Sequence, residues 1–169
     1  MTHDTLSTLA TIVGARLKAR GLLLATAESC TGGWVAEAVT AIAGSSEWFE
    51  RGFVTYSNHA KMDMLGVSAA TLAAHGAVSE QTAREMATGA LSHSKAQLAL
   101  SITGVAGPGG GSADKPVGMV CFGWAGAGGE AVTLTLTRNF SGDRDSVRRQ
   151  AVICALQGVL ERLEGQSSA

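Results

Sequence analysis

A short stretch of small and hydroxyl-bearing residues, 26–33, is the part of this chain best suited to chemistry. It reads TAESCTGG and joins an apolar run at residues 22–25 to apolar residues at helical spacing from Trp34 to Ile42. Ser29 therefore falls on a predicted strand-to-helix turn. The first backbone N–H groups of a helix have no partners inside the helix, so they can hold an anion or the oxyanion of an acyl-transfer reaction.

Helix capping is the alternative interpretation of the same residues. Ser29 or Thr31 would then be the N-cap, its hydroxyl accepting a hydrogen bond from a backbone N–H. The two glycines would only give the loop its conformational freedom. Spacing alone leaves both interpretations open, because serines that precede helices are common and most of them are caps.

A serine nucleophile needs a base, and a lysine fits that role better here than a histidine. Lys61 stands in the first turn of a helix predicted at residues 58–65 with Asn58 as its cap, and Tyr56 ends the strand before it. Burial at the positive end of a helix lowers the pKa of a lysine from about 10.4, so that its amine can accept a proton. A solvated Lys61 and a Tyr56 with only its hydroxyl in water are the alternatives. The histidines fall in the terminus or in helical and turn segments, where we expect them to be solvated: His3, His59, His75 and His93.

A glycine-rich segment at residues 104–111 follows an apolar run that ends at Thr103. It does not match the phosphate-binding loop of nucleoside triphosphatases, because Lys115 follows no glycine and precedes Pro116. It also leads into a predicted strand rather than a helix, which argues against a Rossmann cofactor site. The segment is either a loop whose backbone cradles a phosphate or pyridine, or a plain connector.

Arginines gather at the start of the last predicted helix, which Ser141 or Asp143 would cap. Arg144 is a candidate for gripping a phosphate, because a guanidinium at a helix start is otherwise unfavourable for the helix dipole. We expect Arg148 and Arg149 on the solvated face of the helix.

The order of elements predicts an α/β sandwich with a mixed central sheet flanked by helices, because strands and helices alternate first and a hairpin follows. Ser29, Tyr56 and Thr103 each follow or end a strand, and ligands gather beyond the carboxyl ends of such strands. The expected helices are 6–20, 31–43, 58–65, 68–74, 79–92 and the C-terminal one. The expected strands are 22–27, 48–57 with its strongest signal from Gly52 onward, 96–103, 117–124 and 131–137. The last two are joined through a glycine-rich turn that includes Gly128 and Gly129.

Length and composition favour a single domain at residues 1–165, followed by a polar tail at 166–169. The formal net charge of −1 gives no general basic field, so we expect no nucleic acid as a partner. No apolar run is long enough for a membrane span, and we expect no membrane association. The 3 cysteines, Cys30, Cys121 and Cys154, lack metal-ligand spacing and indicate a reducing compartment, so we expect a cytoplasmic protein.

Four motifs in this order resemble the CinA C-terminal domain family. They are TAESCTGG at 26–33, GFVTYSNHAK at 52–61, GAVS at 76–79, and SITGVAGPGGG at 101–111 followed by KPVG. The resemblance covers nearly the whole chain and fits the stand-alone form of the family, without the molybdopterin-binding-like domain of longer members.

The resemblance implies a nicotinamide-nucleotide amidohydrolase, which converts nicotinamide mononucleotide and water into nicotinate mononucleotide and ammonia in pyridine nucleotide salvage. It assigns the nucleophile to Ser29 and supporting roles to Lys61 and Tyr56. The family also implies association of copies into a dimer or larger oligomer. The alternative is a non-catalytic nucleotide-binding or regulatory module, because a pocket alone does not prove turnover.

The remaining site residues follow as a hypothesis from this resemblance. Backbone N–H groups of Thr31, Gly32 and Gly33 would hold the oxyanion, while Glu28 would orient Lys61 or bind ribose hydroxyls. The alternative for Glu28 is a structural carboxylate near the helix start. Neither a metal nor an organic cofactor is required. The pocket lining and the phosphate site would use Thr103, Gly104, Arg144 and Ser46.

Overall fold

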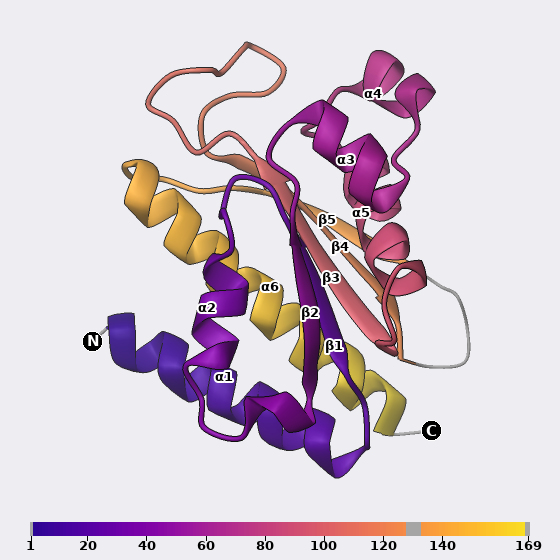
Figure 1. Cartoon of the computed structure of the whole chain (residues 1–169). Coiled ribbons are helices and arrows are strands. Elements are labelled where there is room, and N and C mark those ends of the chain that lie inside the picture. The colour runs from indigo at the N-terminus through magenta and orange to yellow at the C-terminus, as the bar shows by residue number, and fades with distance from the viewer. Residues whose placement is uncertain (1, 128–132, 168–169) are drawn as a thin grey trace.

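The computed structural model describes residues 2–127 and 133–167. In chain order the elements are α1 (Thr2–Ala19), β1 (Leu24–Glu28), α2 (Trp34–Thr40), the short 3₁₀ helix η1 (Ser45–Glu47), β2 (Phe49–Val54), α3 (Asn58–Leu65), α4 (Ala69–His75), α5 (Glu80–Ser92), β3 (Leu98–Gly104), β4 (Met119–Gly126), β5 (Leu134–Asn139) and α6 (Arg144–Ser167). Figure 1 shows them packed as helices around one sheet.

The five strands form one mixed sheet in the order β2-β1-β3-β4-β5. β1 pairs in parallel with both β2 and β3, whereas β4 is antiparallel to β3 and to β5. The predicted α/β architecture with a mixed sheet is therefore confirmed. The antiparallel pairing of β4 with β5 is also confirmed, but Gly128 and Gly129 of the predicted turn lie outside the described residues.

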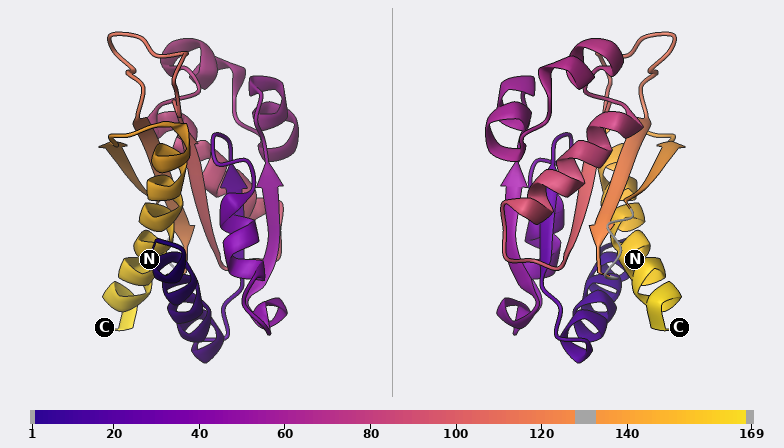
Figure 2. Two further views of the ribbon diagram at one scale, coloured as in Figure 1. Left: turned by 90° about the vertical axis from the view of Figure 1, so that its left-hand side faces the viewer. Right: turned by 90° about the vertical axis from the view of Figure 1, so that its right-hand side faces the viewer.

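Helices cover both faces of the sheet. α1, α2 and α6 lie together on one face, and α5 lies across the other with α3 and α4 beside it (Figures 1 and 2). The alternation of side chains along β3 explains both layers: Leu100 and Ile102 join the core under α6, whereas Ala99 and Ser101 face α5. The small residues on the face of the sheet that α5 covers let the α5 backbone approach the sheet closely.

Several predicted boundaries differ from the structure by a few residues, and three of the differences are as follows. α2 begins at Trp34 rather than at residue 31, because Gly32 and Gly33 have φ values of 60° and 104° that interrupt the helical backbone. β2 spans Phe49–Val54, inside the predicted 48–57 but ending three residues earlier, so Tyr56 lies just beyond it. α6 runs to Ser167, past the expected boundary at residue 165.

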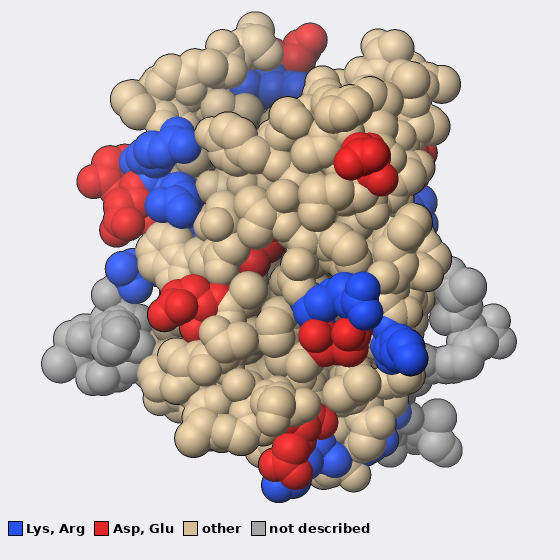
Figure 3. All heavy atoms as spheres, in the orientation of Figure 1, with Lys and Arg blue, Asp and Glu red and all other residues tan. Residues whose placement is uncertain are grey.

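No helix within the described residues combines the length and the apolar character that a membrane crossing requires. On the face drawn in Figure 3, basic and acidic side chains are interspersed rather than gathered into one basic patch.

Candidate active site

The carboxyl ends of the three parallel strands meet at one edge of the sheet. Glu28, the last residue of β1, pairs with Val54 of β2 and with Ile102 of β3. The ladder extends one step further, because Ser29 N donates to Ile102 O at 3.0 Å and Thr55 N donates to Glu28 O at 2.8 Å. The residues after β1 and β2 therefore lie next to each other, as the predicted common rim requires.

Lys61 reaches this rim from α3 and contacts the predicted nucleophile. Its Nζ lies 2.9 Å from Ser29 Oγ. The N-cap of α3 is Ser57, whose hydroxyl accepts from Ala60 N, and not Asn58 as the sequence suggested. This cap starts the helix so that Lys61, in its first turn, turns inward: its side chain is only 1% exposed. The alternative of a solvated lysine is excluded.

The surroundings of the Lys61 amine favour its neutral form. Nζ also donates to Thr55 O at 3.0 Å and to Tyr56 O at 3.2 Å. A neutral amine has two hydrogens, so these two carbonyls can take both and leave the lone pair for the Ser29 hydroxyl. Burial lowers the pKa of Lys61 below its ordinary value of 10.5, and no carboxylate within the described residues forms an ion pair with it. The contact therefore has the geometry of a nucleophile and its general base.

Cys30 stands beside Ser29 but is poorly suited to be the nucleophile. It is 7% exposed, and burial raises the pKa of its thiol to about 11. The thiolate is the reactive form of cysteine, so this thiol is almost entirely unreactive near neutral pH. The interpretation of Cys30 as a buried filler agrees with these surroundings.

Glu28 does not offer an open carboxylate to a substrate, because it is 1% exposed and its oxygens accept from protein donors. The donors are the Thr31 hydroxyl at 2.6 Å and the backbone N–H groups of Gly33, Val35 and Ala36 at 3.2, 3.0 and 3.1 Å. Glu28 therefore caps α2, a role the sequence had given to Ser29 or Thr31. This placement corrects the expectation that Glu28 contacts Lys61 or a ribose.

The predicted oxyanion donors need a similar correction. Gly33 N–H is bound to Glu28, and Gly32 N–H donates to Ser29 O at 3.1 Å. Thr31 is fully buried. Within the described residues, the Cys30 N–H donates to no backbone carbonyl, and its one protein contact is with the Cys30 thiol itself. It follows the nucleophile directly, as does the donor in other strand–turn–helix nucleophile sites. It is the amide best placed for an oxyanion.

Tyr56 and Arg144 lie at the open side of the rim. The Tyr56 side chain is 65% exposed, and its hydroxyl lies 3.5 Å from Arg144 Nη2. It touches the Lys61 amine through its backbone carbonyl rather than through its phenol. Arg144 Nη1 also donates to Gly107 O at 2.7 Å, so this arginine joins the tyrosine to the glycine-rich loop. Asp143 caps α6 and fixes the position of Arg144, since Asp143 Oδ1 accepts from Ser146 N at 2.9 Å.

Thr103 and Gly104 end β3 beside the rim, and the contacts of both are structural. The Thr103 hydroxyl donates to Ala77 O at 2.8 Å. A Cβ at Gly104 would lie 2.8 Å from a Val120 methyl and 2.9 Å from Met119 O, so glycine is required for packing against β4. Their place next to Ile102, whose carbonyl accepts from Ser29 N, brings their backbone near the rim, and a role in lining the pocket stays a prediction.

The structure does not bring Ser46 to the site. Ser46 lies in η1, before β2 begins, and Phe49 pairs with Leu24 at the start of β1. It therefore lies at the opposite end of the sheet from Ser29, and the expected pairing of Ser46 with Arg144 on one phosphate is wrong.

Arg148 is a site residue that the sequence analysis missed. It is half-buried rather than solvated, and it donates from Nε to Cys30 O at 3.0 Å and from Nη2 to Thr31 O at 3.1 Å. Its guanidinium lies 5.3 Å from the centre of the Trp34 ring. The signal in the sequence was its spacing, since Arg148 lies one helical turn after Arg144 on α6.

Within residues 2–127 and 133–167, no group of three histidine, cysteine, aspartate or glutamate side chains could hold a metal ion. At the rim itself the groups brought together are the Ser29 hydroxyl, the buried Lys61 amine and polar backbone. The model of the CinA C-terminal domain matches residues 6–163. The chain belongs to this family.

Relatives in the CinA family agree with that assignment. The chain is 60% identical over 157 residues to the nicotinamide-nucleotide amidohydrolase PncC of Escherichia coli K12, covering 93% of this chain and 94% of the relative. It is 48% identical to the protein of the same name from Pseudomonas putida, with 94% and 97% covered. The crystal structure of the competence/damage inducible protein CihA from Agrobacterium tumefaciens superimposes with a TM-score of 0.89 at 46% identity, with 95% of this chain and 96% of that one covered.

Proposed function

We propose that this chain is a nicotinamide-nucleotide amidohydrolase that converts nicotinamide mononucleotide and water into nicotinate mononucleotide and ammonia. The names of its relatives from Escherichia coli and Pseudomonas putida support the substrate. The observation that carries the chemistry is the 2.9 Å contact between Ser29 Oγ and the buried Lys61 Nζ. An unprotonated amine that faces a serine hydroxyl activates it for attack on an amide carbon.

In the first half-reaction, Ser29 Oγ attacks the carboxamide carbon and its proton passes to Lys61 Nζ. The tetrahedral intermediate carries its negative charge on the former carbonyl oxygen, which the Cys30 N–H stabilises. Lys61 then gives the proton to the amide nitrogen, the C–N bond breaks, and ammonia leaves. Tyr56 assists this proton transfer from the outer side of the site. Ser29 now carries a nicotinoyl ester.

In the second half-reaction, water attacks the ester carbon and gives a proton to Lys61. The C–O bond to Ser29 breaks, and Lys61 returns the proton to Ser29 Oγ. The products are the starting enzyme and the carboxylic acid form of the nucleotide, which then loses its remaining proton to solvent to give the carboxylate. The chain supplies every proton acceptor and donor that this sequence needs, so no metal ion or organic cofactor takes part.

Arg144 is the residue we assign to the 5′-phosphate. Its guanidinium lies at the open side of the rim between Tyr56 and the glycine-rich loop, and it holds Gly107 O at 2.7 Å. Thr103 and Gly104 border the same space. A phosphate there would exchange the neutral partners of Arg144 for charge-assisted hydrogen bonds, which are stronger.

Ammonia release from nicotinamide mononucleotide by the purified protein tests the function, and Ser29→Ala tests the mechanism. We expect turnover by the wild type, and a fall in kcat of at least about 10³-fold in Ser29→Ala, because no other side chain replaces the nucleophile. Hydroxylamine should trap the acyl group of the wild type as nicotinohydroxamate mononucleotide. A wild type that binds the nucleotide without releasing ammonia would be a binding module. Turnover that survives in Ser29→Ala would refute the mechanism alone.

We also infer that copies of the chain associate and that the protein works in the cytoplasm. β2 and β5 are the edge strands of the sheet within the described residues. Light scattering after size exclusion measures the oligomer. The thiols of Cys30, Cys121 and Cys154 are all free, as in a reducing compartment.

A further inference from the structure

We propose that Arg148 is a positioning residue that clamps the nucleophile turn against α6 and so aligns Ser29 and the Cys30 N–H for acyl transfer. The inference rests on the proposed serine mechanism. On this proposal Arg148 affects turnover but not substrate binding, because its guanidinium donates to the backbone oxygens of Cys30 and Thr31.

The clamp consists of two hydrogen bonds from one guanidinium to neighbouring peptides. Arg148 Nε donates to Cys30 O at 3.0 Å and Nη2 donates to Thr31 O at 3.1 Å. A planar guanidinium with two donors fixes both the position and the orientation of the peptides it holds. Cys30 O and Thr31 O belong to the two residues that directly follow Ser29, so any tilt of these peptides also moves Ser29 Oγ and the Cys30 N–H.

Glu28 holds the other side of the same turn. The Glu28 carboxylate accepts hydrogen bonds from the N–H groups of Gly33, Val35 and Ala36. The Arg148 guanidinium donates hydrogen bonds to backbone carbonyls of the same turn. The backbone between them has left-handed φ values at Gly32 and Gly33, which no helix or strand stabilises. Two charged side chains of opposite sign therefore hold a segment that regular secondary structure does not.

α6 also connects this turn to the substrate side of the site. Arg144 and Arg148 lie one helical turn apart on the same face. The first holds Gly107 O and the Tyr56 hydroxyl, and the second holds the turn after Ser29. The glycine-rich loop, the tyrosine and the nucleophile thus take their relative positions from one rigid helix.

Arg149 provides a matched control. It has the same side chain, lies one position further along α6, and stacks on the same Trp34 ring at 4.9 Å, compared with 5.3 Å for Arg148. It faces Asp145 at 3.8 Å and makes no hydrogen bond to the nucleophile turn in the described part of the chain. Loss of Arg149 removes a charge and a Trp34 contact but leaves the clamp intact.

The experiment compares Arg148→Gln with Arg149→Gln by measuring kcat and KM for nicotinamide mononucleotide. We expect kcat to fall about 10- to 100-fold in Arg148→Gln with KM changed less than about threefold, because misplacement of reacting groups by about 1 Å costs about 100-fold in rate. Arg149→Gln should stay within about twofold of the wild type. Calorimetry in a Ser29→Ala background should give the same nucleotide affinity with and without Arg148→Gln.

Arg148→Lys keeps the charge but lacks the two-donor plane, so it should recover only part of the lost kcat, and it serves as the test variant if Arg148→Gln does not fold. Equal kcat in the Arg148 and Arg149 variants overturns the proposal, and so does a loss confined to KM or to nucleotide affinity. An active Ser29→Ala variant would refute the serine mechanism itself. An inactive Ser29→Ala variant combined with an Arg148→Gln variant of unchanged kcat would refute only the role of Arg148.

Discussion

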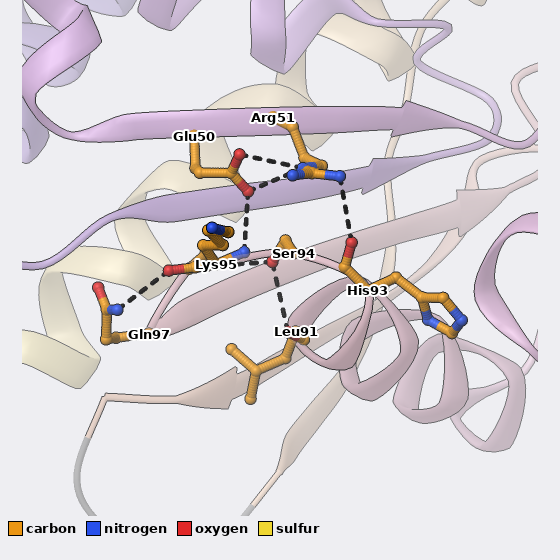
Figure 4. A network of polar contacts seen from close by, with 8 residues as sticks. Glu50, Arg51, Leu91, His93, Ser94, Lys95 and Gln97 are labelled. Atoms are coloured by element: carbon orange, nitrogen blue, oxygen red, sulfur yellow. Dashed lines mark hydrogen bonds and ion pairs between the residues drawn. The ribbon is translucent and has the colours of Figure 1, made fainter.

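The two ends of the central sheet carry polar networks with similar side chains in opposite environments. At the carboxyl end, the Lys61 amine is buried and its partners are a serine hydroxyl and two carbonyls. At the amino end, Glu50 joins Arg51 at 2.8 Å and the Lys95 N–H at 3.0 Å, and Arg51 reaches His93 O (Figure 4). The second network is open to water.

The two networks differ in burial and in the presence of a counter-charge, and on the proposed mechanism this difference is what makes Lys61 the base. The Arg51 side chain lowers the pKa of the Glu50 carboxyl, which favours its ordinary charged form. Desolvation lowers the pKa of Lys61, which favours the uncommon neutral form. Only the second change moves a side chain toward the form that can accept a proton.

The largest effect should follow from replacing the buried amine. Lys61→Met keeps the length and apolar volume of the side chain but has no base, so kcat should fall by about 10²- to 10⁴-fold, the usual contribution of a general base. Lys61→Arg should be as inactive at every pH, because a guanidinium stays protonated. Ammonia release from pH 6 to 10 measures both. A Lys61→Arg variant with wild-type activity would contradict the assignment of the base.

An intermediate effect is expected for Glu28→Gln. The amide cannot match the carboxylate as acceptor for three backbone N–H groups, so the free energy of unfolding should fall by about 1–3 kcal/mol. The turn after Ser29 should loosen and kcat should fall about tenfold, while KM stays constant. Chemical denaturation and steady-state kinetics check the two parts. Unchanged stability would show that Glu28 does not cap α2 in solution.

Cys30→Ala should have a small effect. The thiol is buried with its pKa raised to about 11, and the substitution keeps the backbone N–H that we assign to the oxyanion. We expect kcat within about threefold of the wild type, and slow reaction of the wild type with iodoacetamide at neutral pH. Loss of turnover in Cys30→Ala together with an active Ser29→Ala would exchange the roles of the two residues.

Arg51→Ala should have the smallest effect of all. The Arg51 side chain is 44% exposed, and water screens its pairing with Glu50, so we expect kcat and the unfolding midpoint to match those of the wild type. Thermal unfolding monitored by circular dichroism, together with the ammonia assay, checks this. A large loss of activity would link the amino end of the sheet to the site and remove the contrast between the two networks.

The sequence was sufficient to predict the sandwich and the common rim. Apolar runs and helix-breaking glycines mark most elements, and parallel strands place their carboxyl ends together, so Ser29, Tyr56 and Lys61 were expected near one another. Lys61 lies in the first turn of α3, as its spacing predicted.

The side-chain partners could not be predicted in the same way, because they depend on contacts between residues far apart in the chain. Glu28 caps α2 across a turn of two left-handed glycines, which local capping rules do not anticipate. Arg148 reaches Cys30 O from more than 100 positions away. Ser46 was expected at the phosphate site as a hypothesis from the family resemblance, and strand pairing puts it at the opposite end of the sheet.

The protonation of Lys61 is the central claim, and NMR titration of its Nζ measures it directly, with Lys61→Met to assign the signal. We predict a pKa clearly below 10.5, with the rise of kcat/KM with pH following the same titration. The folded state then binds fewer protons than the unfolded chain between the two pKa values, so stability should rise with pH across that window in the wild type and lose this contribution in Lys61→Met. A Lys61 pKa at or above 10.5 would leave Ser29 without a base and contradict the account.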